Sequence, residues 1–410
     1  MKLSWETLEE LAHRYGASFY LLDSRKFERN YDQLLKAFRD IYPKTFIGYS
    51  YKTNYIPKLC SIVNRKYGYA EVVSDMELDL AIKVGVPLQR IIYNGPFKDA
   101  KSIKKCLLGG GIVNLDSLYE VPIVEKIARE NPQANMYLGV RCNFDVGDSL
   151  TSRFGFDIEG KDFYSVLEKL QKISNIRLGL HCHFPNRCLE SFIIRVEKML
   201  QLADQLFSSP PEFIDIGGGF FGKMSGSLRK ELEFKCKVPS YQEYAEAIAT
   251  RFQSFYRAVD EAAKPKLFVE PGTALVADTM KFVAKVISIK RVRNKTIATV
   301  SGSKFNILPA SAAVNLPVSV FHKPEKDNSA DRYDSIDIAG YTCIENDYLY
   351  RGYRGSLSVG DYIVFDNVGS YSIVLKPPFI LPNSAVVEYN SETKLFEVVK
   401  RREETDDIFR

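Results

Sequence analysis

The chain has 410 residues, of which 45% are hydrophobic and 26% charged, the composition of a folded globular protein. Its formal net charge of +5 is too weak to indicate nucleic acid or an anionic membrane as a partner. No apolar run approaches the roughly 18 residues that span a bilayer, and the charged, amphipathic start MKLSWETLEELAHRYG predicts a cytoplasmic protein.

The cysteines give no sign of a cross-linked or metal-bound fold. Their number is odd, their spacing is irregular, and no CxxC pair occurs, which argues against a disulfide framework and a structural zinc site. We therefore expect most of them to be reduced thiols in the core, and we predict no metal. The seven positions are Cys60, Cys106, Cys142, Cys182, Cys188, Cys236 and Cys343.

Short apolar segments alternate with helical ones from about residue 19 to residue 272. The expected strands are 19–23, 46–52, 71–74, 91–95, 112–116, 137–141, 177–183, 213–219 and 267–272. The expected helices include 25–39, 75–84, 117–129 and 192–207. Such repetition makes parallel strands joined by right-handed crossovers. Eight strands counted from residue 46 favour a closed (β/α)8 TIM barrel over an open doubly wound sheet, and we assign it residues 25–275.

After residue 272 the helical spacing largely disappears, and strands alternate with turn residues. We predict a second, antiparallel β domain built from residues 1–24 and 276–402. The charged end, residues 403–410, is expected to be a solvated, frayed tail. Residues 221–240, which follow a run of glycines, are placed to form a flap over a site.

In a (β/α)8 barrel the functional residues lie at the carboxyl ends of the strands. At these ends the sequence places polar or charged groups that do not suit a plain hydrophobic core. They are Lys52, Glu71, Ser74, Asn94, Arg141, His181, His183, Gly217, Gly218, Gly219 and Glu270.

Two of these features have both a chemical and a plain structural interpretation. Burial in a barrel mouth would depress the pKa of Lys52, as a Schiff-base amine requires, although Lys52 could equally be a surface lysine just past the strand. The three glycines, Gly217–Gly219, allow backbone N–H groups to converge on a phosphate, but they also suit a tight turn.

The remaining candidates have similar alternatives. Glu270 can hold the pyridinium N–H of a cofactor or be an ion-paired structural glutamate. His181 and His183 alternate along one expected strand, so they should point to opposite faces, which disfavours a two-histidine metal site. One imidazole could lie flat on an aromatic cofactor or simply pack. Cys343 lies in GYTCIENDYL, where it could also be an inert buried thiol.

The order of these motifs resembles the fold type III pyridoxal-phosphate (PLP) decarboxylases, which include the diaminopimelate, ornithine and arginine decarboxylases. The resemblance covers nearly the whole chain and is strongest to the diaminopimelate decarboxylase branch. The matching segments are YSYKTN around Lys52, EVVSDMEL (71–78), SRFGF (152–156), GLHCH (179–183), DIGGGF (215–220), VEPG (269–272), CIEND (343–347) and GSY (369–371).

The resemblance implies a role for each matching residue. Lys52 would hold PLP covalently, His183 would stack on its ring, Glu270 would keep the ring nitrogen protonated, and Cys343 would protonate the carbanion across a homodimer interface. The family forms head-to-tail homodimers with shared active sites. The phosphate would lie on Gly217, Gly218, Gly219 and Tyr371, with Asn186 at the position of a phosphate-binding serine; Glu71, Glu77 and Arg141 would be supporting charges.

Four positions depart from the family pattern: Asn186 for the serine, Thr273 for an arginine after EPG, Leu308 for an arginine, and Ile344 for an acid after the cysteine. We therefore predict an active decarboxylase whose substrate is not meso-diaminopimelate, such as a conjugated diamino acid of a siderophore or other specialised pathway. The alternatives are meso-diaminopimelate decarboxylase itself, a PLP-dependent racemase, a catalytically dead binding homologue, and a sugar-phosphate barrel enzyme without PLP.

Overall fold

The computed structural model describes residues 3–148, 150–232, 236–308, 314–324, 331–390 and 392–409. The chain divides into two compact units. The barrel unit consists of Glu28–Phe221 and Cys236–Ala274, and the β unit consists of Met1–Phe27, Gly222–Lys235 and Leu275–Arg410. Most of the segment expected to form a flap thus groups with the β unit, and its residues 233–235 lie outside the described residues.

The barrel unit confirms the predicted TIM-like fold. Among the described residues, eight strands pair in parallel, and the β5–β6 and β10–β2 pairings close the sheet into a ring. A further strand of two residues, β7 (Phe156–Asp157), pairs with the end of β6. The eight strands are β2 (Thr45–Ser50), β3 (Tyr69–Val72), β4 (Ile91–Tyr93), β5 (Ile112–Leu115), β6 (Met136–Asn143), β8 (Ile176–His181), β9 (Phe213–Asp215) and β10 (Lys266–Val269).

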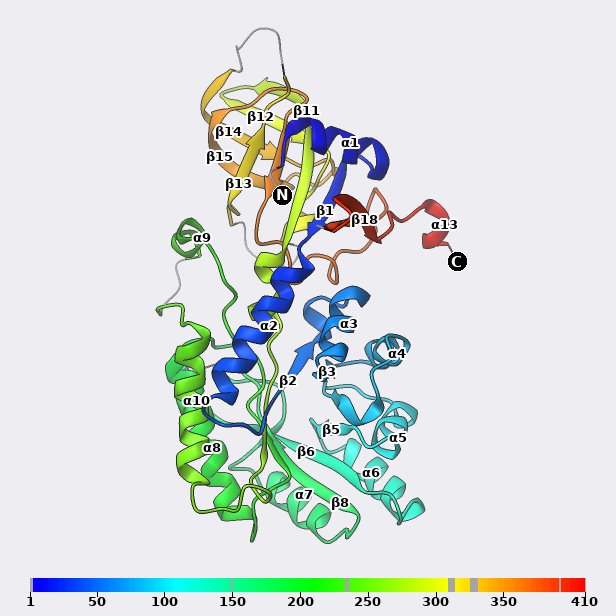
Figure 1. Ribbon diagram of the computed structural model, residues 1–410, viewed down its shortest axis with the longest axis vertical. Helices are drawn as coiled ribbons and strands as arrows, with labels where there is room; N and C mark the ends of the chain where they lie inside the picture. The colour runs from blue at the N-terminus through cyan, green and yellow to red at the C-terminus, as the bar shows by residue number, and fades with distance from the viewer. Residues whose placement is uncertain are drawn as a thin grey trace. The chain divides into compact units, whose positions relative to one another are not determined.

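Helices follow the strands and lie around them (Figure 1). Local side-chain caps set where they begin: Ser74 accepts from the Glu77 N–H at the start of α4, and a Ser240–Glu243 capping box begins α10. The helices are α2 (Ser24–Arg39), α3 (Pro57–Arg65), α4 (Asp75–Lys83), α5 (Ala100–Leu108), α6 (Glu120–Glu130), α7 (Lys161–Gln171), α8 (Leu189–Leu206) and α10 (Tyr241–Phe255), with short 3-10 turns η1 (Tyr51–Thr53) and η2 (Leu88–Arg90).

One end of the barrel is closed by apolar side chains. Phe213 packs against Phe268, with ring centroids 5.8 Å apart, and a Cβ added to Gly179 would lie only 2.6 Å from the Phe213 ring. Only glycine therefore leaves room for this ring beside β8. The residues of this apolar end, which lie at or near the starts of their strands, are Phe46, Tyr69, Ile92, Ile112, Phe213 and Phe268, with Tyr137 packed against them.

The β unit is a mixed sheet in the order β15-β14-β12-β11-β1-β17-β18, with β16 pairing β11 and β13. The predicted antiparallel domain is confirmed as mostly antiparallel, because only the β1–β17 and β12–β14 pairings among the described strands are parallel. Its strands are β1 (Ser18–Leu22), β11 (Met280–Val292), β12 (Lys295–Val300), β13 (Val318–Phe321), β14 (Arg332–Ala339), β15 (Tyr348–Ser356), β16 (Tyr362–Phe365), β17 (Val386–Asn390) and β18 (Leu395–Lys400).

Helix α1 (Trp5–Tyr15) covers this sheet with Leu8 and Leu11, which pack into its core. The segment expected to be a solvated tail contains a short helix, α13 (Thr405–Ile408), whose residues are exposed and in which Asp407 forms an ion pair with Arg401. The other short elements are α9 (Gly226–Glu231), α11 (Thr273–Val276), η3 (Ala277–Thr279) and α12 (Lys304–Ile307). Among the described residues, no helix combines the length and the apolar character needed to cross a membrane.

One pair of cysteines is an exception to the expectation that most are reduced thiols in the core. Cys188, the N-cap of α8, forms a disulfide with Cys236, 48 residues further along the chain. Spacing along the sequence did not indicate this pair, because the returning chain before α10 brings the two residues together. Of the other described cysteines, Cys60, Cys106, Cys142 and Cys182 are buried free thiols, as expected, and Cys343 is exposed.

Candidate active site

Lys52 lies at the mouth of the barrel, in the 3-10 turn η1 directly after β2. Its Nζ forms an ion pair with Oε2 of Glu71, which lies in β3 one residue before its end and whose side chain is fully buried. The Lys52 side chain is 29% exposed. The chain therefore leaves the strand in a turn that directs this lysine to a buried carboxylate, which excludes the alternative of a solvated surface lysine.

A chain of amides joins this ion pair to a second buried carboxylate. Asn94, which follows β4, donates through Nδ2 to Oε1 of Glu71 at 2.9 Å and to Oε1 of Glu270 at 2.5 Å. Asn114 of β5 in turn donates to Oδ1 of Asn94 at 2.7 Å. The carboxyl ends of β3, β4, β5 and β10 thus share one hydrogen-bonded network.

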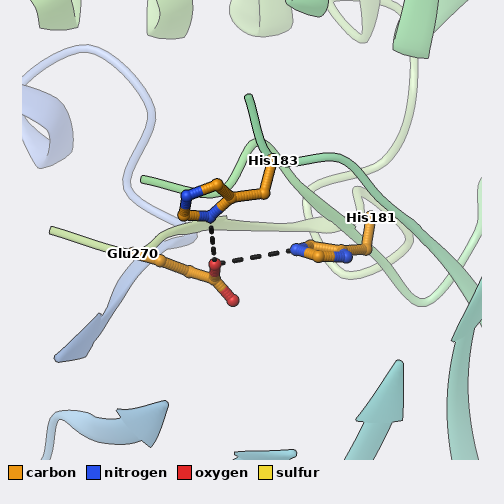
Figure 2. Close-up of side chains that lie close together, drawn as sticks. All are labelled: His181, His183 and Glu270. Carbon is orange, nitrogen blue, oxygen red and sulfur yellow. Dashed lines mark hydrogen bonds and ion pairs between the residues drawn. The ribbon is translucent and has the colours of Figure 1, made fainter. Parts of the chain in front are cut away.

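Glu270 follows β10, and two histidines converge on its other oxygen (Figure 2). Its Oε2 lies 3.2 Å from Nδ1 of His183 and 3.6 Å from Nε2 of His181. The prediction that these histidines point to opposite faces is wrong. Strand β8 ends at His181, so strand alternation no longer applies at His183, which lies in the following loop.

The charge states of this cluster follow from burial and contact. Burial lowers the pKa of His183 to about 3 and lowers that of His181, so both rings are neutral near pH 7. Burial alone would raise the pKa of Glu270, but the contact with His181 and the nearby charge of Lys52 outweigh it and hold this pKa well below its ordinary value. Glu270 is therefore an ionised carboxylate at the base of the site.

His181, His183 and Glu270 also have the chemistry of a metal site, since one ligand atom from each lies within 4.8 Å of the others. However, Nδ1 of His183 accepts a hydrogen bond from the Gly218 N–H at 3.1 Å. This bond fixes the imidazole edge against the glycine turn. The same trio suits an aromatic cofactor, because Glu270 offers a charge and His183 offers a ring anchored along one edge.

The glycine turn after β9 packs tightly on the loop of the histidines. Gly217 has φ +72° and Gly219 has φ +94°, a region that favours glycine, and a Cβ on Gly218 would lie 2.4 Å from the Glu270 carbonyl oxygen. Asp215 Oδ1 accepts from the Gly217 N–H at 2.8 Å. Burial and the nearby Glu270 raise the pKa of Asp215 well above its ordinary value, so Asp215 is protonated beside the ionised Glu270.

Two further predicted residues border this centre. Arg141 of β6 donates to Asp116 Oδ1 at 2.9 Å and to the His183 carbonyl oxygen at 3.2 Å, so it supports the loop that carries His183. Asn186 lies in the same loop, and its Oδ1 accepts from the Cys188 N–H at 3.0 Å. The side-chain amide nitrogen of Asn186 takes no part in this hydrogen bond.

Two predicted site residues, Cys343 and Tyr371, belong to the β unit. Cys343 is exposed, in the turn between β14 and β15. Tyr371 follows β16 and has φ +61°. Asp347 holds the turn of Cys343, because its carboxylate accepts from Thr342 Oγ1 at 2.7 Å and from the Lys304 N–H at 2.8 Å. The roles of Cys343 and Tyr371 remain predictions.

Sequence reasoning missed three residues of the barrel centre: Asn114, Asp215 and Arg195. Asn114 and Asp215 could have been found from the sequence, because each is a polar residue within an apolar strand. Arg195 was detectable in a different way. It falls on the same face of its helix as Phe192 and Met199, so a cation interrupts an apolar stripe.

Comparisons with known proteins agree with this arrangement. The profile of the family described as pyridoxal-dependent decarboxylase, pyridoxal binding domain, matches residues 25–277. Diaminopimelate decarboxylase of Archaeoglobus fulgidus is 25% identical over 97% of this chain and 93% of its own. The structure of diaminopimelate decarboxylase from Helicobacter pylori complexed with L-lysine superposes with a TM-score of 0.81 at 21% identity, covering 98% of each chain.

Fold and site together define a barrel enzyme that uses an aromatic aldehyde cofactor, and the chain belongs to the pyridoxal-dependent decarboxylase family. Within it the chain is a distant relative of the diaminopimelate decarboxylases, takes PLP, and acts on an amino acid. The fold alone does not identify the substrate amino acid. Lysine decarboxylase from Selenomonas ruminantium also superposes, with a TM-score of 0.73 at 20% identity over 93% of this chain and 95% of its own.

Proposed function

We propose that the barrel centre holds PLP between Lys52, His183, Glu270 and the glycine turn. The observation that carries this assignment is the network that joins the Lys52–Glu71 ion pair to Glu270 through Asn94. The residues fit the cofactor: Lys52 for the aldehyde, the ionised Glu270 for the ring N–H, and Gly217, Gly218 and Gly219 for the phosphate. Within the described part of the chain neither buried ring nitrogen of His181 has a hydrogen-bond partner, and Nε2 lies 3.6 Å from Glu270 Oε2.

When bound, PLP supplies an electron sink for the electron pair left as an α-carboxylate departs as carbon dioxide. The residues of this chain act around that event. Glu270 keeps a proton on the ring nitrogen through its negative charge, and Asn94 orients Glu270. Lys52 binds and later recovers the cofactor, with Glu71 holding its amine in place. The Cys343 thiol delivers a proton to the reacting carbon.

We further propose a homodimer with shared sites, in which Cys343 acts across the interface and Tyr371 binds phosphate. Mixing Lys52→Ala and Cys343→Ala protomers tests this. If Lys52 and Cys343 of one site come from different chains, each mixed dimer has one intact site, and activity should return to about a quarter of wild type. Two inactive variants that stay inactive after subunit exchange, or an active monomer, would contradict the shared site.

For the substrate, we propose an amino acid other than meso-diaminopimelate, such as a conjugated diamino acid. Thr273 and Leu308 stand at positions where the related enzymes carry arginine, and each lost charge-assisted contact would weaken binding by about 1.5–3 kcal/mol. Ile344, which replaces an acid, has a 37% exposed apolar side chain. These positions support a distal group that is recognised differently.

The first experiment is an absorbance spectrum of the purified protein followed by a screen for carbon dioxide release. We expect a visible band from lysine-bound PLP that is lost in Lys52→Ala. The screen compares meso-diaminopimelate, lysine, ornithine, arginine, glutamate and citrate-conjugated diamino acids. Rapid release from meso-diaminopimelate would refute the proposed substrate class, and absence of the band with added PLP would refute the assigned site.

A further inference from the structure

Arg195 is a fully buried cation behind the glycine turn. It lies in the second turn of α8 (Figure 1), and within the described part of the chain no carboxylate forms an ion pair with it. Its guanidinium instead donates to main-chain carbonyls. Nη1 lies 2.9 Å from the Gly218 oxygen, and Nη2 lies 3.1 Å from the Phe184 oxygen and also contacts the Asn186 oxygen.

These carbonyls belong to two different loops of the candidate site. Gly218 lies in the turn after β9, and Phe184 and Asn186 lie in the loop after β8. One planar guanidinium therefore fixes the spacing between the two loops, which a lysine ammonium with its compact charge cannot do in the same way. Ser191 Oγ accepts from Nε at 3.2 Å and holds the guanidinium in orientation.

The carbonyl contacts determine where the neighbouring N–H groups point. In a trans peptide the C=O and the following N–H have opposite directions. With the carbonyls of Gly218 and Asn186 turned toward Arg195, the N–H groups of Gly219 and Arg187 are turned away from it. Neither N–H has a hydrogen-bonded acceptor among the described residues. Two free N–H donors from adjacent loops, with a cation behind them, make an anion-binding concavity.

We propose that Arg195 is the positioning residue of the PLP phosphate site: it holds both loops in the anion-binding arrangement and supplies the positive charge behind them. The inference rests on the proposed assignment of the phosphate to the glycine turn. Among the described residues this buried guanidinium is balanced by carbonyl dipoles, the Ser191 hydroxyl and the Phe192 ring but by no carboxylate, which is costly, and a phosphate dianion at the front of the loops offsets that cost. The positive charge and the free donors thus point to the same ligand.

The test measures dissociation constants of PLP and of pyridoxal, which lacks the phosphate, for cofactor-free wild type, Arg195→Lys and Arg195→Met. Both ligands can react with Lys52, so their ratio isolates the phosphate contribution. We expect the dissociation constant for PLP to rise about 10- to 100-fold in both variants, and that for pyridoxal to change less than about threefold. Stabilisation of the cofactor-free protein by inorganic phosphate, seen as a melting shift, should disappear.

Arg251→Met is the matched control, because Arg251 lies on α10 beside α8 and forms a surface ion pair with Glu197. It should leave both constants unchanged. Ser191→Ala keeps the guanidinium and removes only its orienting acceptor, so it should weaken PLP about two- to fivefold even if the Arg195 variants fold poorly.

The outcomes separate the two proposals. If wild type binds PLP no more tightly than pyridoxal, the glycine turn does not hold the phosphate, and the proposed cofactor placement fails. If wild type prefers PLP and the Arg195 and Ser191 variants keep that preference, or lose PLP and pyridoxal affinity equally, Arg195 is only a structural link between α8 and the loops, and the inference is refuted.

Discussion

The two ends of the barrel are built from opposite kinds of residues. At the starts of the strands, aromatic and aliphatic side chains such as Phe213 and Phe268 fill the interior. At the carboxyl ends, Glu71, Asp215 and Glu270 are buried carboxyl groups that depend on Lys52, amides and backbone N–H groups for compensation. The first arrangement stabilises the fold through burial. Burying the carboxyl groups lowers the stability of the fold, and the site requires their charge.

This contrast predicts that the two ends respond differently to mutation. Substitutions at the apolar end should lower the free energy of unfolding and leave the chemistry of the folded enzyme intact. Substitutions at the polar end should reduce activity much more than stability. Comparing kcat with the free energy of unfolding in variants of the two ends tests this contrast.

Glu270→Gln should have the largest effect. The amide is nearly isosteric but lacks the charge that would keep the cofactor nitrogen protonated, so we expect kcat to fall about 10³-fold, or about 4 kcal/mol in the activation barrier. The variant should still fold and show the lysine-bound PLP band. Glu212→Gln, at an exposed position before β9, is the control. A Glu270→Gln rate within tenfold of wild type would show that this carboxylate does not act on the cofactor.

Phe213→Ala tests the apolar end. Phe213 is 2% exposed and packs on Gly179 and Phe268, so its removal leaves a cavity and should lower the free energy of unfolding by about 3–5 kcal/mol in urea titrations. The kcat of the folded variant should stay within about twofold of wild type. Phe255→Ala, at a 44% exposed position, should change stability by less than about 0.5 kcal/mol. A large loss of kcat in Phe213→Ala would mean that the two ends are coupled.

The comparison also explains what could be predicted from the sequence. Lys52, Glu71 and Glu270 were predictable because each is a charged residue at or within two residues of the carboxyl end of an apolar strand, and parallel strands bring these ends to one edge. The contact of both His181 and His183 with Glu270 was not, since it depends on where β8 ends. The Cys188–Cys236 bond depends on how a long connection returns, and local spacing carries no information about that path.

Cys236→Ser tests a stabilising link at the polar end. The disulfide joins the start of α8 to the chain before α10 and closes a loop of 48 residues, so its loss should lower the free energy of unfolding by about 2–4 kcal/mol. Wild type treated with dithiothreitol should match the variant. Thiol counting on protein taken from reducing cytosol shows whether the bond forms there, where such bonds are rare. If Cys236→Ser is as stable as oxidised wild type, the bond does not stabilise the barrel.

Asp215→Asn should give the smallest effect, and its sign depends on pH. In the folded protein the pKa of Asp215 is raised well above its ordinary value, whereas in the unfolded chain it is ordinary, about 3.9. Below that value both states bind the proton. As the pH rises further, only the unfolded state ionises, and wild type loses up to about 1.4 kcal/mol of stability per pH unit until the folded pKa is reached.

Asparagine does not titrate, and its Oδ1 can still accept from the Gly217 N–H as Asp215 Oδ1 does. The stability of Asp215→Asn relative to wild type should therefore improve from pH 5 to pH 7 in parallel urea titrations. Asp157→Asn, at an exposed position, should show no such trend. If the difference between Asp215→Asn and wild type is constant across this range, Asp215 is ionised in the folded protein. The polar end would then hold Asp215 and Glu270 as two neighbouring anions, instead of one anion beside a neutral acid.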